Sequence, residues 1–340
     1  MAKAEKLPSG TWRVQAYKNG VRKSFSALTK EAAEAAACMW KLEQSDPRHP
    51  EHMRLQEAFD RYINARSKIL SPATIREYKR IKRSYLQGIM FVPIDKLTTE
   101  LIQAAINEEA THLAPKSLRC VNGLLSAVMK AYAPGYQSRV VLPQKERNEI
   151  VIPSEEEIRT IYQAVKDTYN EIPFLLASQA GMREGEICGL QFKHIDRAKN
   201  TIRICQAKVR VEHGTTIKAP KSYSGNRTLT VSPFLIERIF VLSENTKSDA
   251  FVVPWSMNAV SHRWAHVLKQ AGVPHFKFHA LRHYFASQLL LAGVPIKYAC
   301  EMMGHDTESK MHLIYQHTFP EAKLKFSAAM ASKTESLLGK

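Results

Sequence analysis

This sequence of 340 residues contains few cysteines and no long apolar run. The five cysteines are odd in number, scattered and without a Cys-x-x-Cys pair, which predicts reduced, mostly buried thiols in a cytosolic protein and not a disulfide framework. They are Cys38, Cys120, Cys188, Cys205 and Cys300. No uncharged apolar stretch reaches about 18 residues, and no apolar core follows the charged N-terminus, so we expect neither a membrane span nor a secretion signal.

Metal ligands in a suitable arrangement are also scarce. Two histidine pairs, His262 with His266 and His279 with His283, have the i, i+4 spacing of a zinc site on a helix. No acidic or cysteine third ligand is evident beside either pair. There is no internal repeat and no low-complexity tract. We therefore expect no metal and no other cofactor.

Acidic residues are too few to balance the basic ones. The chain has 49 Lys and Arg against 32 Asp and Glu, a formal net charge of +17. This excess favours a polyanionic partner, nucleic acid above all, and the alternative is a basic protein with a solvated surface. Hydrophobic residues make up 44%, as in an ordinary soluble protein, and the length predicts two or three domains, each with its own core.

Residues 11–26 alternate in character around Asn19-Gly20, a strong signal for a β-hairpin. The predicted turn pairs Lys18 with Val21, Tyr17 with Arg22, and Val14 with Phe25. One face of the hairpin carries the apolar residues Trp12, Val14 and Phe25. This face can pack on a helix that Thr29 caps and that runs to about Gln44.

The opposite face of this hairpin carries Arg13, Gln15, Tyr17, Arg22 and Ser24. Basic side chains next to an aromatic ring and amide donors are typical of a β-ribbon that enters a DNA groove. An exposed polar sheet face is the alternative interpretation.

A linker rich in helix breakers, residues 45–50, precedes a helical segment. Helices are predicted near residues 52–66, 72–87, 98–109 and 115–132. Ser71 caps the second of these helices ahead of Pro72, and its packing residues are Ile75, Tyr78 and Tyr85. Its basic residues lie mostly on other sides and favour phosphate contact, with a solvated helix as the alternative; they are Arg76, Lys79, Arg80 and Arg83.

A second linker, residues 137–153, separates this segment from the C-terminal part. Ser154 and Glu157 form a predicted capping box at the start of a helix. Strands are predicted at Thr201–Cys205, Lys208–Val211 and Thr228–Val231, and helices resume from about Met257. The fold class is therefore multidomain, mainly α with small β-sheets (α+β). We expect an N-terminal three-stranded sheet plus helix, a helical domain and a mixed α/β domain.

Six residues of the C-terminal half suit metal-free phosphodiester chemistry: Arg183, Lys221, His279, Arg282, His305 and Tyr315. The planar fork of an arginine holds phosphate oxygens bidentately, and a helical spacing of three places His279 and Arg282 on one face. Tyr315 is a candidate nucleophile whose phenol, with a reference pKa of about 10, needs a base or a cationic surround. His279 is the candidate base and His305 the donor to the phosphate, although either histidine suits either duty.

Four stretches carry a family resemblance: Ala180-Gly181-Met182-Arg183-Glu184-Gly185-Glu186, His279-Ala280-Leu281-Arg282-His283, Gly304-His305 and Tyr315-Gln316-His317. In this order they resemble the boxes of the tyrosine recombinases, specifically the phage-type integrases of temperate phages and integrative conjugative elements. The resemblance covers the catalytic half closely and the N-terminal half only by its layout. Met303 stands where a leucine is usual, a swap that conserves volume.

The resemblance implies a division of the chain. Residues 1–46 would form an arm-type DNA-binding domain, 51–136 a helical core-binding (SAM-like) domain, and 154–340 the catalytic domain with a C-terminal tail. It implies that Lys221 is the β-hairpin lysine that protonates the leaving 5′ hydroxyl, with Lys218 as the alternative. Glu186 resembles the carboxylate that orients active-site groups, and its alternative role is an ordinary helix ion pair.

The resemblance also implies a reaction and partners. Tyr315 attacks the scissile phosphate to give a 3′-phosphotyrosyl bond, which the 5′ hydroxyl of a partner strand later attacks, without metal or ATP. Four protomers on two DNA duplexes pass through a Holliday junction and integrate or excise a phage or mobile element. The partners are core-type and arm-type attachment sites, a homotetramer, and an excisionase and a host DNA-bending protein as further candidates. The expected location is the bacterial cytoplasm, on DNA and not at a membrane.

The tail from Pro320 to Lys340 is predicted to be amphipathic, with Ala322, Leu324, Phe326, Ala329 and Met330 on its pattern. It suits docking on a neighbouring protomer or packing on its own domain. Three other functions compete with recombination: a type IB topoisomerase, a catalytically inactive DNA-binding regulator, and a metal-dependent nuclease.

Overall fold

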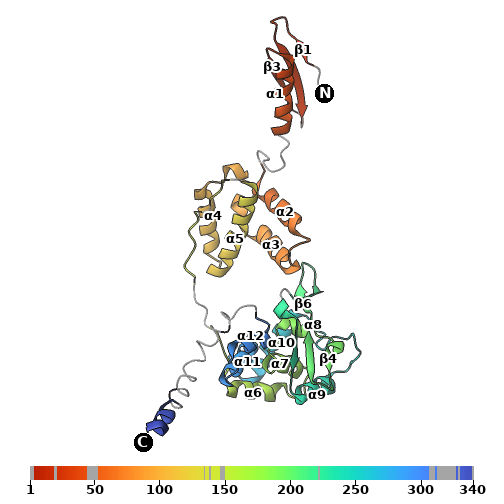
Figure 1. Cartoon of the computed structure of the whole chain (residues 1–340), viewed down its shortest axis with the longest axis vertical. Coiled ribbons are helices and arrows are strands. Elements are labelled where there is room, and N and C mark those ends of the chain that lie inside the picture. The colour runs from red at the N-terminus through yellow and green to blue at the C-terminus, as the bar shows by residue number, and fades with distance from the viewer. Residues whose placement is uncertain are drawn as a thin grey trace. The chain divides into compact units, whose positions relative to one another are not determined.

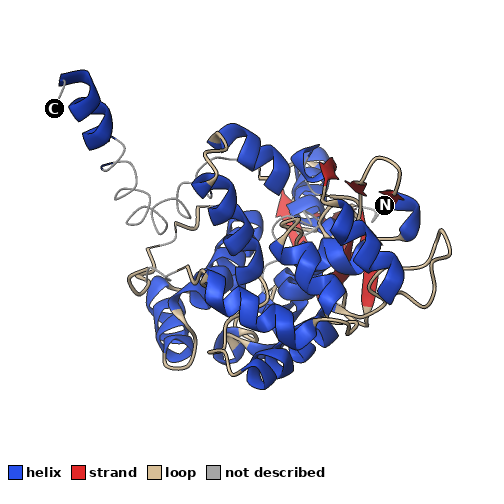
Figure 2. Cartoon of the chain, turned by 90° about the horizontal axis from the view of Figure 1, so that it is seen from below, coloured by secondary structure: helices blue, strands red, loops and turns tan. Residues whose placement is uncertain are grey.

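The computed structural model describes residues 4–18, 21–43, 53–133, 135–137, 139–145, 150–220, 223–305, 311, 327 and 330–338. The chain divides into two compact units, residues 1–146 and 147–340. Helices dominate both units and the strands are few and short (Figures 1 and 2), which confirms the predicted fold class. Among the described helices, none is long and apolar enough to cross a membrane.

The N-terminal module is a three-stranded antiparallel sheet packed on one helix. Its elements are β1 (Glu5–Lys6), β2 (Trp12–Lys18), β3 (Val21–Ala27) and α1 (Lys30–Glu43), and the strand order is β1-β2-β3. All three predicted residue pairs across the hairpin are confirmed. Val14 on β2 is buried against Ala33 and Trp40 of α1, as the apolar face required. Thr29 Oγ1 accepts a hydrogen bond from the backbone N–H of Ala32 and caps the helix as predicted.

Four helices and two short 3-10 turns form a helical body with its own hydrophobic core. They are α2 (Leu55–Arg66), α3 (Pro72–Ser84), η1 (Gln87–Ile89), η2 (Ile94–Lys96), α4 (Thr99–Ala110) and α5 (Pro115–Tyr132). The four predicted helices are confirmed, but α3 ends three residues before the predicted end. The reason is tertiary: Leu86 has a positive φ of 59°, and its N–H donates to the buried carboxylate of Glu109 at 2.6 Å.

The chain segment after α5 packs on the helical body. Val140 and Leu142 lie against its core. Between them, Val141 exchanges two hydrogen bonds with the side-chain amide of Gln103, at 2.8 and 3.1 Å. The first half of the predicted linker is therefore held in place by α4.

Seven helices between residues 155 and 303 and two small sheets make up the body of the second unit. The helices are α6 (Glu155–Val165), α7 (Glu171–Ser178), α8 (Glu184–Gly189), α9 (Pro233–Leu242), α10 (Met257–Ala271), α11 (Ala280–Leu291) and α12 (Ile296–Met303), with 3-10 turns η3 (Phe192–His194) and η4 (Tyr223–Gly225). One sheet has the order β4-β5-β8 from Ile195–Asp196, Thr201–Ile204 and Arg227–Thr230. A hairpin pairs β6 (Ala207–Arg210) with β7 (Thr215–Lys218).

Most of the expected local structure of this unit is present. The capping box of Ser154 and Glu157 is confirmed by its two reciprocal hydrogen bonds, at 2.8 and 3.2 Å. The three predicted strands are confirmed within one residue at each end. Strands β4 and β7 and helices α7, α8 and α9 were not predicted, although Ser232 and Pro233 carry the cap and first-turn proline that mark the start of α9.

Candidate active site

Arg183 lies where the loop after α7 enters helix α8. It takes the N-cap position, and its backbone N–H donates to the carboxylate of Glu186 at 2.9 Å. Its guanidinium donates to the same carboxylate through Nη1 at 2.6 Å and to the carbonyl of Gly304 through Nη2 at 2.5 Å. The side chain keeps 35% of its surface exposed. The guanidinium is thus fixed on one side and open to a ligand on the other.

Arg282 lies in the first turn of α11 and is 1% exposed. Its Nη1 donates to the carbonyl of Gly181 and its Nη2 to the carbonyl of Met303. Burial, and then repulsion from Arg183, lower its pKa to about 9, which leaves the guanidinium charged at neutral pH.

Helix α12 ends in a Schellman motif at Gly304. The N–H of His305 donates to the carbonyl of Cys300 at 2.9 Å and that of Gly304 to Glu301 at 3.1 Å. Gly304 has a φ of +61°, a conformation that favours glycine. The motif leaves the last carbonyls of the helix pointing at the arginines and places half-buried His305 directly after them.

Glu186 connects Arg183 to a residue that was not predicted, Arg227. The buried carboxylate accepts from Arg227 through Nη1 at 3.1 Å and Nη2 at 2.9 Å. Burial by itself raises the pKa of Glu186, but the hydrogen bonds and charges of Arg227 and Arg183 outweigh it and lower the pKa to about 2. Nothing in the local sequence marks Arg227, because its partners lie in distant segments.

His279 precedes α11 and faces His283 one turn later. Their ring centroids are 4.9 Å apart and the rings are perpendicular. Desolvation of its ring is the main cause that lowers the pKa of His279 to about 4, and the charges of His283, Arg282 and Arg183 add to this shift. His279 is therefore a neutral imidazole at physiological pH, able to accept a proton.

The structure brings together four of the predicted residues, Arg183, His279, Arg282 and Glu186, and places His305 at the end of α12 beside them. Lys221 and Tyr315 lie outside the described residues. Lys218, the alternative to Lys221, is the last residue of β7 and lies opposite Ala207 in the hairpin.

The predicted DNA-contacting residues of the N-terminal module share one face of its sheet, opposite buried Val14 and Ala16. They are Arg13, Gln15, Tyr17 and Arg22. Tyr17 is 67% exposed. Arg22 donates to the amide oxygen of Gln15, and Arg13 lies 3.7 Å from the carboxylate of Glu5.

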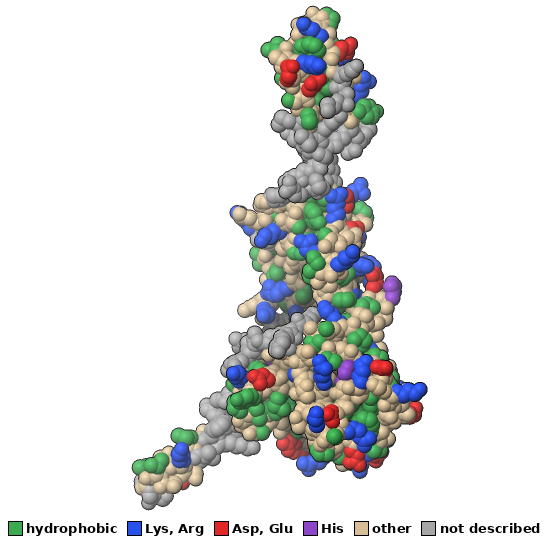
Figure 3. Space-filling model, turned by 45° about the vertical axis from the view of Figure 1, so that its right-hand side comes forward, with side chains coloured by type: hydrophobic (Ala, Val, Ile, Leu, Met, Phe, Trp, Pro, Cys, Tyr) green, Lys and Arg blue, Asp and Glu red, His purple; other side chains and the backbone are tan. Residues whose placement is uncertain are grey.

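The four basic residues of α3 differ in their surroundings. Arg80 is held by the carboxylate of Glu77, at 2.6 and 3.0 Å, and by the hydroxyl of Tyr85 at 2.6 Å. Lys79 and Arg83 are exposed and Arg76 is half-buried. Lys and Arg side chains are spread over this helical body in Figure 3, with fewer acidic ones among them.

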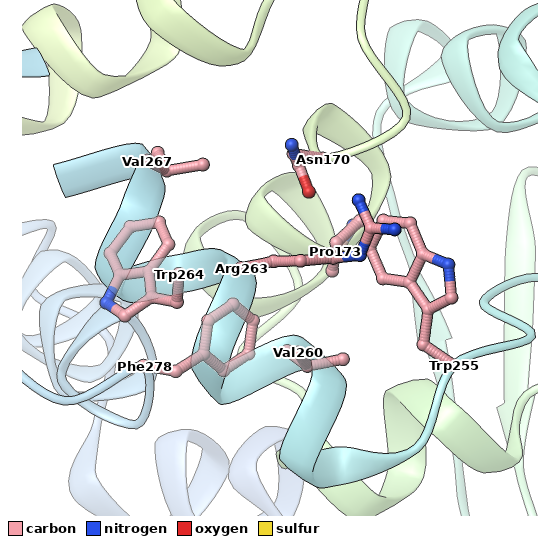
Figure 4. A pocket seen from close by; sticks show the side chains of 8 residues that line it. All are labelled: Asn170, Pro173, Trp255, Val260, Arg263, Trp264, Val267 and Phe278. Carbon is pink, nitrogen blue, oxygen red and sulfur yellow. The ribbon is translucent and has the colours of Figure 1, made fainter. Parts of the chain in front are cut away.

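A small pocket in the second unit involves none of the predicted catalytic residues (Figure 4). It is lined by Asn170, Pro173, Trp255, Val260, Arg263, Trp264, Val267 and Phe278. The Arg263 guanidinium lies 4.1 Å from the centre of the Trp255 ring and closes one side of the pocket.

Among the residues whose placement is described, no group of three or more His, Cys, Asp or Glu could hold a metal ion.

Comparison with known proteins gives a family and several relatives. The model of the phage integrase family matches residues 152–322. A protein named tyrosine recombinase XerC-like, from Caldanaerobacter subterraneus, is 27% identical over 298 residues, 74% of this chain and 76% of that protein. The integrase of Salmonella phage P22 is 26% identical over 226 residues, 64% of this chain and 55% of that protein.

Solved structures show the same fold. The integrase of transposon Tn1549 in complex with circular intermediate DNA aligns with a TM-score of 0.64 and 20% identity, covering 82% of this chain and all of that one. A lambda integrase tetramer bound to a Holliday junction aligns with a TM-score of 0.57 and 16% identity, covering 91% of this chain and 94% of that one. At these identities the likeness concerns the fold.

Proposed function

This chain belongs to the phage integrase family, and we propose that it is a site-specific DNA recombinase that cleaves and rejoins DNA through a 3′-phosphotyrosyl intermediate. One observation carries the proposal: Arg183 and Arg282 both donate to the C-terminal end of α12, beside His305, and their charges act on His279. Two arginines and two histidines around one point form a site for a phosphodiester group.

We propose that the two arginines bind the non-bridging oxygens of the scissile phosphate. Each guanidinium uses two nitrogens on the protein, which leaves N–H groups of its five donors for the phosphate. Negative charge accumulates on those oxygens during attack, and each preorganised donor can contribute about 3 kcal/mol to the transition state.

Two proton transfers complete the cleavage step. Tyr315 attacks phosphorus, and its phenolic proton passes to His279, which is neutral and therefore able to take it. The bond to the 5′ oxygen breaks, and that oxygen receives a proton from Lys221, with Lys218 as the alternative donor. His305 donates a hydrogen bond to the phosphate, unless the two histidines exchange these duties.

The second half of the reaction reverses the first on a different strand. The 5′ hydroxyl of a partner strand attacks the phosphotyrosyl bond, so one phosphodiester is formed for each one broken and the tyrosine is regenerated. Because bond energy is conserved, we propose that neither ATP nor a metal ion takes part. Full activity in the presence of a chelator is the expected result, and its loss would point to a metal-dependent nuclease.

Strand exchange between two duplexes needs four active sites. We therefore propose that this chain acts as a tetramer, the state in which lambda integrase is bound to a Holliday junction. The basic face of the N-terminal sheet would contact arm-type sites and the basic residues of α3 core-type sites, with an excisionase and a host DNA-bending protein as accessory partners. Of the predicted tail contacts only Met330 lies among the described residues, where it is 62% exposed within a helix over residues 330–338.

The proposal is tested with nicked suicide substrates, in which the short leaving strand diffuses away and traps the covalent complex. The wild-type chain should form the adduct, and Tyr315→Phe should bind the same DNA without forming it. A second assay compares recombination between two sites with relaxation of supercoiled DNA. Relaxation without recombination would favour a type IB topoisomerase, and undiminished recombination by Tyr315→Phe would contradict the mechanism.

A further inference from the structure

Arg227, the first residue of β8, is buried next to the candidate active site without being one of its predicted members. Its side chain is 7% exposed. All three guanidinium nitrogens are occupied by the protein: Nη1 and Nη2 donate to Glu186, and Nε donates to the carbonyl of Met302 at 2.8 Å. A side chain held in this way is not placed to bind substrate itself.

Glu186 is shared between Arg227 and Arg183. Oε1 accepts from Nη1 of both arginines, at 3.1 and 2.6 Å. Oε2 accepts from Arg227 Nη2 and from the backbone N–H of Arg183, both at 2.9 Å. Because the carboxylate is buried and bonded on both sides, its orientation, and with it that of the Arg183 guanidinium, depends on Arg227.

The end of α12 links the same groups a second time. Three consecutive carbonyls, of Met302, Met303 and Gly304, accept from Arg227, Arg282 and Arg183 in that order. Positive side chains are favourable at the C-terminal end of a helix. The approach of Arg227 also requires glycine at position 304, since a Cβ there would lie 2.7 Å from Arg227 Nη1 and 2.9 Å from the Ser224 carbonyl.

We propose that Arg227 is a positioning residue for strand cleavage, one that orients Arg183 through Glu186 and fixes the end of α12 from which His305 follows. The inference rests on the function proposed above. It assigns to Arg227 no contact with DNA and no proton transfer. Loss of the Arg227 side chain should leave DNA binding intact and slow the cleavage step. Glu186 would keep its charge but lose one of its two arginine partners, so its carboxylate would hold the Arg183 guanidinium in a different orientation.

The same unit contains a matched pair with a purely structural role. Arg238 on α9 donates to buried Glu171 through Nε at 2.6 Å and Nη2 at 2.7 Å. Its Nη2 also donates to Asp167, so the hydrogen bonds of this guanidinium to described residues go to Glu171 and Asp167, which lie outside the candidate active site. Arg238→Met therefore removes a comparable buried ion pair without touching the arginines at the end of α12.

The experiment uses the full chain and a nicked suicide duplex, with saturating protein and single-turnover kinetics. Arg227→Met should reduce the rate of adduct formation roughly 10- to 100-fold, the factor that corresponds to losing a charge-assisted hydrogen bond. Arg238→Met should cleave at the wild-type rate at a temperature where thermal unfolding shows both variants folded. DNA affinity should change less than about twofold in both, because phosphate contacts made elsewhere dominate it.

Two further variants make the test independent of folding and distinguish its outcomes. Arg227→Lys keeps the charge but lacks the fork, and should recover part of the rate. In a chain that already carries Arg183→Lys, Arg227→Met should reduce the cleavage rate little further, because both changes act on the guanidinium of Arg183. A wild-type rate for Arg227→Met, or full additivity with Arg183→Lys, overturns the inference while the proposed function stands. A wild-type chain that forms no adduct overturns both.

Discussion

Arg282 donates through Nη1 to the carbonyl oxygen of Gly181, a residue 101 positions earlier in the chain. This contact ties the first turn of α11 to the loop that leads into α8, and therefore holds Arg282 next to Arg183. Gly181 has a φ of +60°, which turns its carbonyl toward the guanidinium and favours glycine. The position of the Arg282 guanidinium therefore depends on the main-chain conformation at Gly181.

Gly181→Ala should destabilise the second unit and misplace Arg282. A Cβ at this position would clash with Phe285 Cδ1 and would lie 2.9 Å from Met303 Sδ, in addition to the strain of a positive φ. We expect a loss of roughly 2–4 kcal/mol in urea unfolding, from backbone strain and overpacking together. Gly214→Ala is the control, because its φ is +88° and nothing lies within 4 Å of its Cβ. Equal losses of stability in the two variants would show that crowding against Phe285 and Met303 contributes nothing at position 181.

The stability of the second unit should depend on pH through Glu186. Its pKa is lowered from 4.5 to about 2 in the folded chain, so its ionised form stabilises the fold above pH 4.5 and this stabilisation is lost as the pH falls toward 2. Glu186→Gln should therefore cost on the order of 2 kcal/mol at pH 6, and the difference from wild type should shrink below about pH 4. Chemical unfolding at several pH values measures this, and a difference that stays constant with pH would argue against the assigned shift.

His279 should titrate far below an ordinary histidine. In the DNA-free chain its ring is expected to protonate near pH 4, as followed by its NMR chemical shift. His283→Gln removes one of the neighbouring groups that lower this pKa and should raise it, whereas His262→Gln, an exposed histidine on α10, should leave it unchanged. A titration of His279 near 6.5 in the wild-type chain would mean that it is largely protonated at mildly acidic pH, and would weaken its assignment as the base.

Arg83 and Arg80 of α3 should differ in their contribution to DNA binding. Arg83 is exposed, so Arg83→Gln should weaken binding and reduce the slope of log affinity against log salt by about one, the change expected for one lost phosphate contact. Arg80 is engaged by Glu77 and Tyr85, so Arg80→Gln should have a smaller effect. Fluorescence anisotropy at several salt concentrations measures both. A larger effect for Arg80→Gln than for Arg83→Gln would show that the Arg80 guanidinium releases Glu77 when DNA binds.

The features predicted correctly from sequence are those with local causes. The pairing of Val14 with Phe25 follows from a two-residue turn, and the capping box at Ser154 is contained in four residues. In both places the residues that determine the structure are neighbours in the chain, so pattern and propensity suffice.

The features that were missed have distant causes. The end of α3 depends on Glu109, which binds the N–H of Leu86 from 23 residues away. Arg227 acts on Glu186 and Met302, at separations of 41 and 75 residues, so its role cannot be read from a strand pattern. Lys221 and Tyr315 lie outside the described residues, and their roles stay predictions.

Mapping the covalent adduct between the chain and its DNA identifies the nucleophile. The wild-type chain is trapped on a nicked suicide substrate, digested with protease and nuclease, and its nucleotide-bearing peptide is sequenced by mass spectrometry. We expect the modification on Tyr315, joined to a 3′ phosphate. A modification on another tyrosine, such as Tyr298, which is 58% exposed on α12, or the absence of any adduct, would contradict it.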